Sequence, residues 1–222
     1  MTQERWTAVD SYINELLIGK DAVLEQVLAA SAAAGLPEIQ VSPCQGKLLQ
    51  LLAQMQKARR ILEIGTLGGY STIWLARGMA AEGRVITLEA EPLHARVARS
   101  NFELSGLAER IELRLGPALE SLPELAAEGE GPFDLIFIDA DKGGYSAYFA
   151  WALKLSRPGT VIIADNLVRD GAVVDESSTD ASVTGVQAFN KVLAAESRVT
   201  ATILQTVGSK GYDGFALAIV DI

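Results

Sequence analysis

The sequence predicts an α/β protein built around a doubly wound, mainly parallel sheet. From residue 60 onward, short apolar runs alternate with stretches of helical periodicity, a pattern typical of a parallel sheet covered on both faces. Near the end of the chain, two further strand-like runs are separated by only a few residues, so we expect them to pair as an antiparallel hairpin. The 222 residues suffice for a single large domain of this kind.

Helical segments precede the first expected strand. Apolar residues recur at helical spacing over three segments, residues 3–18, 21–34 and 44–57. We expect residues 1–57 to form a helical cover and residues 58–222 to form the sheet domain. Because the apolar residues of the first two helices come before the sheet, they need burial elsewhere. We expect these helices to lie against a partner subunit or over the mouth of a ligand site.

Strands and helices then alternate regularly. The expected strands are residues 60–64, 84–89, 110–115, 133–138 and 159–164. The helices expected between them lie near residues 70–81, 92–105, 118–127 and 143–156. One more helix near 184–196 precedes the two terminal strands, which we expect near 199–206 and 214–220.

Composition narrows the classes of function. The formal net charge of −9, from 28 acidic residues against 19 Lys plus Arg, argues against nucleic acid or an anionic membrane as a partner. The single cysteine, Cys44, excludes an internal disulfide and a cysteine-rich metal site, which suits a reducing compartment. The sequence has neither the pattern of a signal peptide nor an apolar run of about 18 residues. We therefore expect a cytoplasmic protein.

A glycine-rich turn, EIGTLGG, follows the first expected strand. In an open parallel sheet, ligands bind beyond the carboxyl ends of the strands, so this turn is placed to hold one. The dinucleotide fingerprint G-x-G-x-x-G, counted from Gly65, would require glycines where Leu67 and Tyr70 stand, which argues against NAD or FAD. A Walker phosphate loop is excluded as well, because the turn lacks its Gly-Lys pair.

Two acidic residues accompany this turn. Glu63 lies at the tip of the first strand, where a carboxylate suits a cationic ligand better than a phosphate. Glu89 ends the next strand, where it can accept both hydroxyls of a ribose. A ligand with a ribose, a positive charge and no phosphate is S-adenosylmethionine. The alternative is that both acids are solvated strand ends without a ligand.

A second polar cluster is expected at the same edge of the sheet. The segments FIDADKGGY and IIADNLVRDG cover the ends of the fourth and fifth expected strands. They contain Asp139, Asp165 and Asn166, whose two carboxylates and one amide oxygen suit Mg²⁺ or Ca²⁺ far better than zinc. Lys142 follows directly, and a neighbouring cation would make it a usable base. The alternatives are turn-forming residues and a surface lysine.

These motifs carry a family resemblance. With LEIGTLGGYS, FIDADK and ADN in combination, the chain resembles the cation-dependent O-methyltransferases from about residue 36 to its end. This class I, S-adenosylmethionine-dependent family includes the catechol and caffeoyl-CoA O-methyltransferases. The resemblance implies a Rossmann-like seven-stranded sheet of order 3-2-1-4-5-7-6 with an antiparallel last strand. It also implies dependence on Mg²⁺, with Ca²⁺ or Mn²⁺ as alternatives, and a homodimer.

The resemblance also implies roles for individual residues. The implied cofactor-binding residues are Val41, Ser42, Glu63, Gly65, Thr66, Leu67, Ser71, Glu89, Ala118 and Asp139. Val41 and Ser42 would close over the methionine portion of the cofactor. Ser71 would contact the methionine carboxylate at a helix N-terminus, and Ala118 would lie beside the adenine. The implied metal ligands are Asp139, Asp165 and Asn166, and the implied base is Lys142.

From the residues and the resemblance we expect an O-methyltransferase that uses S-adenosylmethionine and Mg²⁺. Its expected substrate is a small aromatic compound with two adjacent hydroxyls, of the catechol, hydroxycinnamoyl or flavonoid type. Two alternatives stay open: a methyltransferase for hydroxyuridine in tRNA, against which the net charge argues, and a non-catalytic protein that binds S-adenosylmethionine. His94, the single histidine, is expected in a structural role on the surface or beside the adenine.

Overall fold

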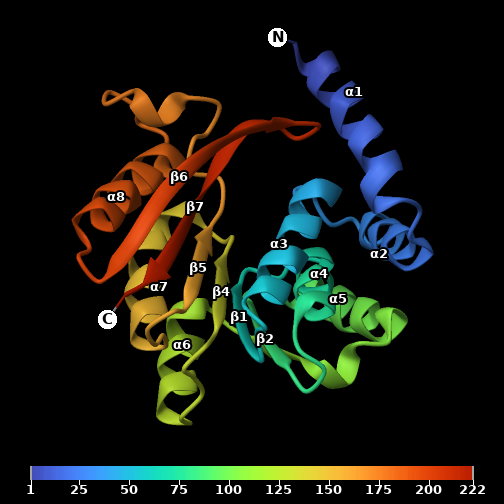
Figure 1. The fold of residues 1–222 in the computed structure, drawn as a ribbon, viewed down its shortest axis with the longest axis horizontal. Helices are drawn as coiled ribbons and strands as arrows, with labels where there is room; N and C mark the ends of the chain where they lie inside the picture. The colour runs from blue at the N-terminus through green and yellow to red at the C-terminus, as the bar shows by residue number, and fades with distance from the viewer. Residues whose placement is uncertain (1, 222) are drawn as a thin grey trace.

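A seven-stranded sheet forms the centre of the protein in the computed structural model, which describes residues 2–221 (Figure 1). Its strands are β1 (Arg60–Ile64), β2 (Arg84–Glu89), β3 (Ile111–Leu115), β4 (Leu135–Ile138), β5 (Val161–Ala164), β6 (Val199–Gly208) and β7 (Gly211–Val220). The strand order is β3-β2-β1-β4-β5-β7-β6. β7 pairs antiparallel with both β5 and β6, whereas β1 to β5 pair in parallel. The predicted order and the antiparallel last strand are confirmed.

Helices cover both faces of this sheet. The α-helices of the described residues are α1 (Gln3–Ile13), α2 (Ala22–Ala33), α3 (Pro43–Met55), α4 (Tyr70–Gly78), α5 (Pro92–Ser105), α6 (Ala118–Ala127), α7 (Tyr145–Lys154) and α8 (Ala181–Ala195). In Figure 1, α3, α4 and α5 lie on one side of the strands and α6, α7 and α8 on the other. Within residues 2–221, every helix is too short or too polar to cross a membrane.

The sheet separates two hydrophobic cores. Successive side chains of a strand point to opposite faces. In β1, Ile61 packs into the core beneath α3, α4 and α5, while Leu62 packs into the core beneath α6, α7 and α8. Both side chains are fully buried. A strand with both faces covered must be apolar throughout, which explains why the central strands show no alternation with polar residues.

The N-terminal helices bury little of their own surface. Leu24 and Val27 of α2 enter the core beside α4 and α5, but none of residues 3–13 in α1 is buried. The helix expected at residues 3–18 ends at Ile13 and continues as a π-helical turn to Ile18. The turn stops at Gly19, whose φ of +69° a residue with a side chain rarely adopts.

The terminal hairpin is longer than the sequence indicated. β6 and β7 remain paired up to Gly208 and Gly211, so most of the expected connection belongs to the strands. The hairpin reaches beyond the sheet toward α1 (Figure 1). There the Asp10 carboxylate accepts a hydrogen bond from the Ser209 amide at 2.7 Å, and the Gln3 side chain donates to the Gly208 carbonyl at 2.9 Å.

The chain leaving β4 turns before it becomes a helix. The helix expected at residues 143–156 is preceded by a 3₁₀ turn, Lys142–Gly144, and α7 begins only at Tyr145. Asp141 caps this turn, because its side chain accepts a hydrogen bond from the Gly144 amide at 2.9 Å. Lys142 therefore lies in a short turn next to the end of β4 and not within α7.

Candidate functional site

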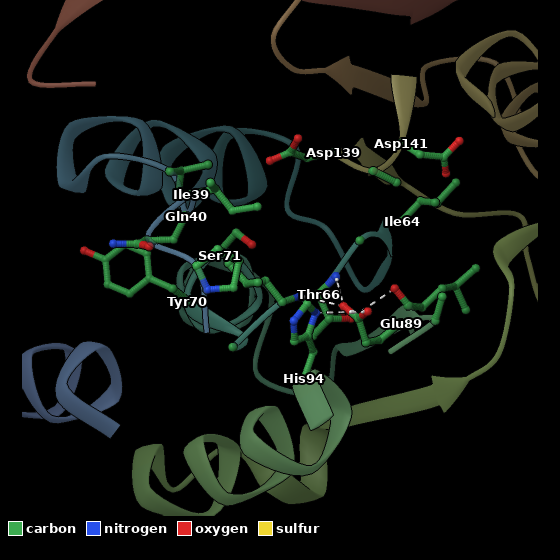
Figure 2. Close-up of a pocket in the computed structure, with 18 of the residues that line it drawn as sticks. Ile39, Gln40, Ile64, Thr66, Tyr70, Ser71, Glu89, His94, Asp139 and Asp141 are labelled. Carbon is green, nitrogen blue, oxygen red and sulfur yellow. Dashed lines mark hydrogen bonds and ion pairs between the residues drawn. The ribbon is translucent and has the colours of Figure 1, made fainter. Parts of the chain in front are cut away.

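A cavity of about 580 Å³ opens at the carboxyl ends of β1, β2 and β4 (Figure 2). The predicted cofactor residues that line it are Val41, Gly65, Thr66, Leu67, Ser71, Glu89, Ala118 and Asp139. Ser42 and Glu63 lie elsewhere. Ser42 is the N-cap of α3, where its hydroxyl accepts a hydrogen bond from the Gln45 amide at 3.2 Å.

The glycine turn after β1 is forced by a close approach of two strand ends. Gly65 has φ of +100°, and a Cβ atom built on it would lie 2.0 Å from the Asp139 carbonyl oxygen. A real Cβ atom cannot occupy that position, so any other residue would push β1 and β4 apart. Glycine at 65 therefore allows the turn and β4 to meet at the floor of the cavity.

Glu89 shapes this turn as well as lining the cavity. One oxygen of its carboxylate accepts hydrogen bonds from the Thr66 amide at 3.2 Å and the Leu67 amide at 2.7 Å. The other oxygen accepts from the Glu91 amide at 2.9 Å and lies 3.5 Å from Nδ1 of His94 (Figure 2). Glu89 is buried, so the interpretation of a solvated strand end is wrong for it. Its contact with a ribose stays a prediction.

Glu63 lies fully buried behind the cavity wall. Its carboxylate accepts hydrogen bonds from the hydroxyls of Ser71 at 2.7 Å, Thr87 at 2.6 Å and Thr72. Burial raises the pKa of this carboxyl to about 7, although the three hydroxyl donors oppose the shift. The solvated interpretation is wrong here too. Of its hydrogen-bond donors, Ser71 lines the cavity, and Thr87 is hydrogen-bonded to Thr66, which lines it too, so Glu63 supports the cavity wall through both.

A second cavity, of about 500 Å³, adjoins the first. Residues 39–41, Asn166 and Arg169 line both cavities, which places the junction between the segment before α3 and the segment that follows β5. Of the predicted metal ligands, Asp139 lines the first cavity and Asp165 the second. The structure thus brings the three predicted ligands to the boundary between two adjoining spaces, one on the side of the glycine turn and one on the side of the β6–β7 hairpin.

The donor set at this boundary suits a hard divalent cation. Asp165 is buried, and burial together with the nearby Asp139 carboxylate raises the pKa of Asp165 above its ordinary value. A cation between the two carboxylates would relieve this repulsion. Within residues 2–221, no three His, Cys, Asp or Glu side chains form a metal-binding group. The predicted third ligand is the amide of Asn166, which lines both cavities. Such an oxygen-only set fits Mg²⁺.

Lys142 lies within the same cluster. Its Nζ atom donates to an Asp139 carboxylate oxygen at 2.9 Å and to the Tyr145 hydroxyl at 2.6 Å. Tyr145 is fully buried, and its hydroxyl lies 3.0 Å from the Asp165 carbonyl oxygen and 3.2 Å from that of Ile138. The interpretation of Lys142 as a solvated surface lysine is therefore wrong, since its side chain is 9% exposed.

Sequence reasoning missed several residues of this site. Tyr145 and Gln45 both contact the predicted metal ligands or Lys142, and Arg169 borders both cavities. No motif marks Gln45, which reaches Asp165 from a helix 120 residues earlier in the chain. His94 was expected on the surface or beside the adenine, and the structure places it in the cavity wall next to Glu89, in agreement with the second of these positions; a contact with the adenine stays a prediction. Its position in the first turn of α5, just after β2, was the available signal.

The strand order, the antiparallel β7 and the cavity beyond the glycine turn define a Rossmann-like methyltransferase fold. Residues 15–219 match the family described as O-methyltransferase. The match spans nearly the whole chain, and the chain belongs to this family of S-adenosylmethionine-dependent enzymes.

Three similar proteins show how close the relationship is. A catechol O-methyltransferase from Niastella koreensis is 55% identical over 99% of this chain and 100% of its own length. An O-methyltransferase from Bacillus cereus, solved with S-adenosylhomocysteine, is 61% identical with a TM-score of 0.98, over 99% of this chain and 100% of its own. An O-methyltransferase of tomaymycin synthesis from Streptomyces achromogenes, solved with S-adenosylmethionine, is 51% identical with a TM-score of 0.96, over 100% of both chains.

The first prediction concerns Glu89. Replacing it by alanine removes the acceptor of two amides in the glycine turn and the expected acceptor of the ribose hydroxyls. Each hydrogen bond to a charged group contributes about 1.5–3 kcal/mol. We expect Glu89→Ala to weaken binding of S-adenosylhomocysteine at least roughly tenfold, as measured by calorimetry.

Glu91→Ala is the matched control for this experiment, because it removes a neighbouring exposed carboxylate and preserves the backbone amide that donates to Glu89. Unchanged affinity in Glu89→Ala would contradict the assignment.

Proposed function

We propose that this enzyme transfers a methyl group from S-adenosylmethionine to one of two adjacent hydroxyls on a small aromatic substrate, in a reaction that depends on Mg²⁺. The observation that carries the proposal is the position of Asp139, Asp165, Asn166 and Lys142 where the two cavities adjoin. The catechol O-methyltransferase of Niastella koreensis supports the substrate class, because it is similar over its whole length.

The cavity beyond the glycine turn is the proposed cofactor site. Two relatives have been solved with S-adenosylmethionine or its demethylated product. We assign the ribose to Glu89, the adenine to the side of Ala118, and the methionine portion to Ser71 and Val41. The amides at the N-terminus of α4, which begins at Tyr70, suit the methionine carboxylate, because a helix N-terminus carries a partial positive charge.

The adjoining cavity is the proposed acceptor site. Mg²⁺ bound by Asp139, Asp165 and Asn166 would hold both acceptor oxygens and lower the pKa of one of them. Asn166 and Arg169 line both spaces, so an acceptor in the second cavity can present an oxygen to the first. The protein then mainly aligns the two substrates and excludes water, since an anionic oxygen attacking a sulfonium loses charge on the way to the transition state.

Lys142 is the proposed base. An amine nitrogen has four tetrahedral positions, and in Lys142 one is bonded to its own chain, one faces Asp139 and one faces Tyr145. One position remains for the proton of the acceptor hydroxyl. Asp139 and Tyr145 therefore fix which side of the nitrogen is presented to the substrate. This orientation supports proton transfer, which is effective only when donor and acceptor atoms are aligned.

The second prediction concerns the metal ligands. Asp165→Ala removes a carboxylate from the proposed Mg²⁺ site, so turnover of a catechol should fall and higher Mg²⁺ should partly restore it. The measurement is initial rate against Mg²⁺ concentration at saturating substrates. Asp175→Ala is the control, because this exposed carboxylate accepts hydrogen bonds from Ser177 in the following loop. If Asp165→Ala kept the wild-type dependence on Mg²⁺, Asp165 would not be a ligand.

The third prediction separates the base from the metal. Lys142→Ala should leave cofactor and metal binding nearly intact and reduce turnover by about 10²–10⁴-fold at neutral pH, the usual contribution of a positioned base. The loss should shrink at high pH, because the metal-bound phenol then ionises without help. Paired pH–rate profiles at saturating Mg²⁺ measure both effects. Equal neutral-pH turnover, with chemistry limiting the rate, would exclude Lys142 as the base.

The fourth prediction is a homodimer. Leu17, just after α1, is 73% exposed, and residues 200–207 along the outer strand β6 are exposed as well. An apolar helix surface and an unpaired strand edge of this length usually acquire a partner. Light scattering at micromolar concentration should give twice the mass of one chain, and Leu17→Lys should lower that mass. A monomeric wild-type protein would contradict the dimer but leave the proposed reaction unaffected.

A further inference from the structure

Gln45 connects two parts of the site that come from distant segments of the chain. It lies in the first turn of α3, and its side-chain amide donates a hydrogen bond to an Asp165 carboxylate oxygen at 2.6 Å. Gln45 lines the second cavity together with Asp165. The contact joins the helix that follows the cofactor-covering segment at Val41 to the end of β5.

The hydrogen bonds of Asp165 show what this contact does. One carboxylate oxygen accepts from the amide of Asn166 at 2.8 Å, and the other accepts from Gln45. The amide of the next residue cannot by itself fix the carboxylate, because the side chain can rotate about two bonds. A second donor on the opposite oxygen holds both torsions, so Asp165 keeps one orientation.

The position of Gln45 is itself held firmly. Ser42 caps α3 by accepting from the Gln45 backbone amide at 3.2 Å. Pro43 stands at the first position of the helix, where its fixed φ favours a helical start. The capped first turn of α3 therefore carries the side chain that reaches Asp165, directly after Val41, which lines the first cavity. Gln45 is only partly exposed, which keeps the amide directed at its acceptor.

We propose that Gln45 is a positioning residue for the metal site, holding the Asp165 carboxylate in the orientation that binds a divalent cation. This inference rests on the proposed function, since it requires Asp165 to be a metal ligand. Residues that hydrogen-bond a ligating side chain commonly contribute 10–100-fold to metal affinity, because they remove the need to order the ligand when the metal binds.

Binding of Mn²⁺ without acceptor substrate tests the proposal directly. Free Mn²⁺ is measured by electron paramagnetic resonance during titration of wild type, Gln45→Ala and Gln45→Leu. Leucine keeps much of the side-chain volume but has no donor. Both variants should raise the Kd for Mn²⁺ by about 10–100-fold. Gln50→Ala is the matched control on the same helix, because Gln50 contacts Lys47 and not the site, and it should bind Mn²⁺ as wild type does.

The Kd for S-adenosylhomocysteine is measured on the same samples and should not change, because Gln45 lies outside the lining of the cofactor cavity. An equal loss of affinity for Mn²⁺ and S-adenosylhomocysteine would mark Gln45 as a general structural residue and overturn the proposal. The proposal would also be overturned if both Gln45 variants bound Mn²⁺ with wild-type affinity while Asp165→Ala did not bind it. Absence of Mn²⁺ binding by wild type would instead overturn the metal site, and the role of Gln45 with it.

Discussion

The backbone of Gly65 lies against the carbonyl of Asp139, and the rest of the site depends on that approach. It brings the ends of β1 and β4 together at the floor of the cavity, where Gly65 has a conformation that side chains disfavour. Because Asp139 is held there by its own backbone, its carboxylate and the lysine three residues later stand beside the glycine turn. A cofactor on the turn and an acceptor on the metal ligands would then meet without any large movement of the protein.

Buried carboxylates are the second feature that organises this edge of the sheet, and each is stabilised in a different way. Glu63 accepts from three hydroxyls, Glu89 from three backbone amides, and Asp165 from one amide and Gln45. Burying such groups without donors would be costly. Glu63 thus supports the cavity wall from behind through its hydroxyl donors, while Glu89 holds the glycine turn that forms part of the lining. Asp139 and Asp165 lie close enough to repel each other, which is the arrangement expected of ligands that share a cation.

Much of the fold could be predicted from the sequence. Apolar central strands indicate a sheet covered on both faces, and the short connection between the last two strands allows only an antiparallel pair. Strand ends differ from the expected positions by up to three residues, as where β7 begins at Gly211 and not near residue 214. The break of the first helix into α1 and a π turn was not predictable, since residues 3–18 have continuous helical periodicity. The candidate site could be predicted because most of its residues lie at or just after the ends of strands. Gln45 was missed because its contact with Asp165 joins segments 120 residues apart, which spacing along the chain does not encode. Tyr145 stands only three residues after Lys142, but no motif indicated that its hydroxyl would contact the lysine.

The central claim is that a metal held between Asp139 and Asp165 brings the acceptor oxygen to the cofactor. Its most direct test is turnover of a catechol with S-adenosylmethionine by metal-depleted enzyme in EDTA, followed by titration with Mg²⁺ in excess of the chelator. The account predicts negligible methylated product in EDTA, and recovery of the full rate as free Mg²⁺ saturates the site. Methylation at the same rate in EDTA and in Mg²⁺, with chemistry limiting the rate, would contradict it.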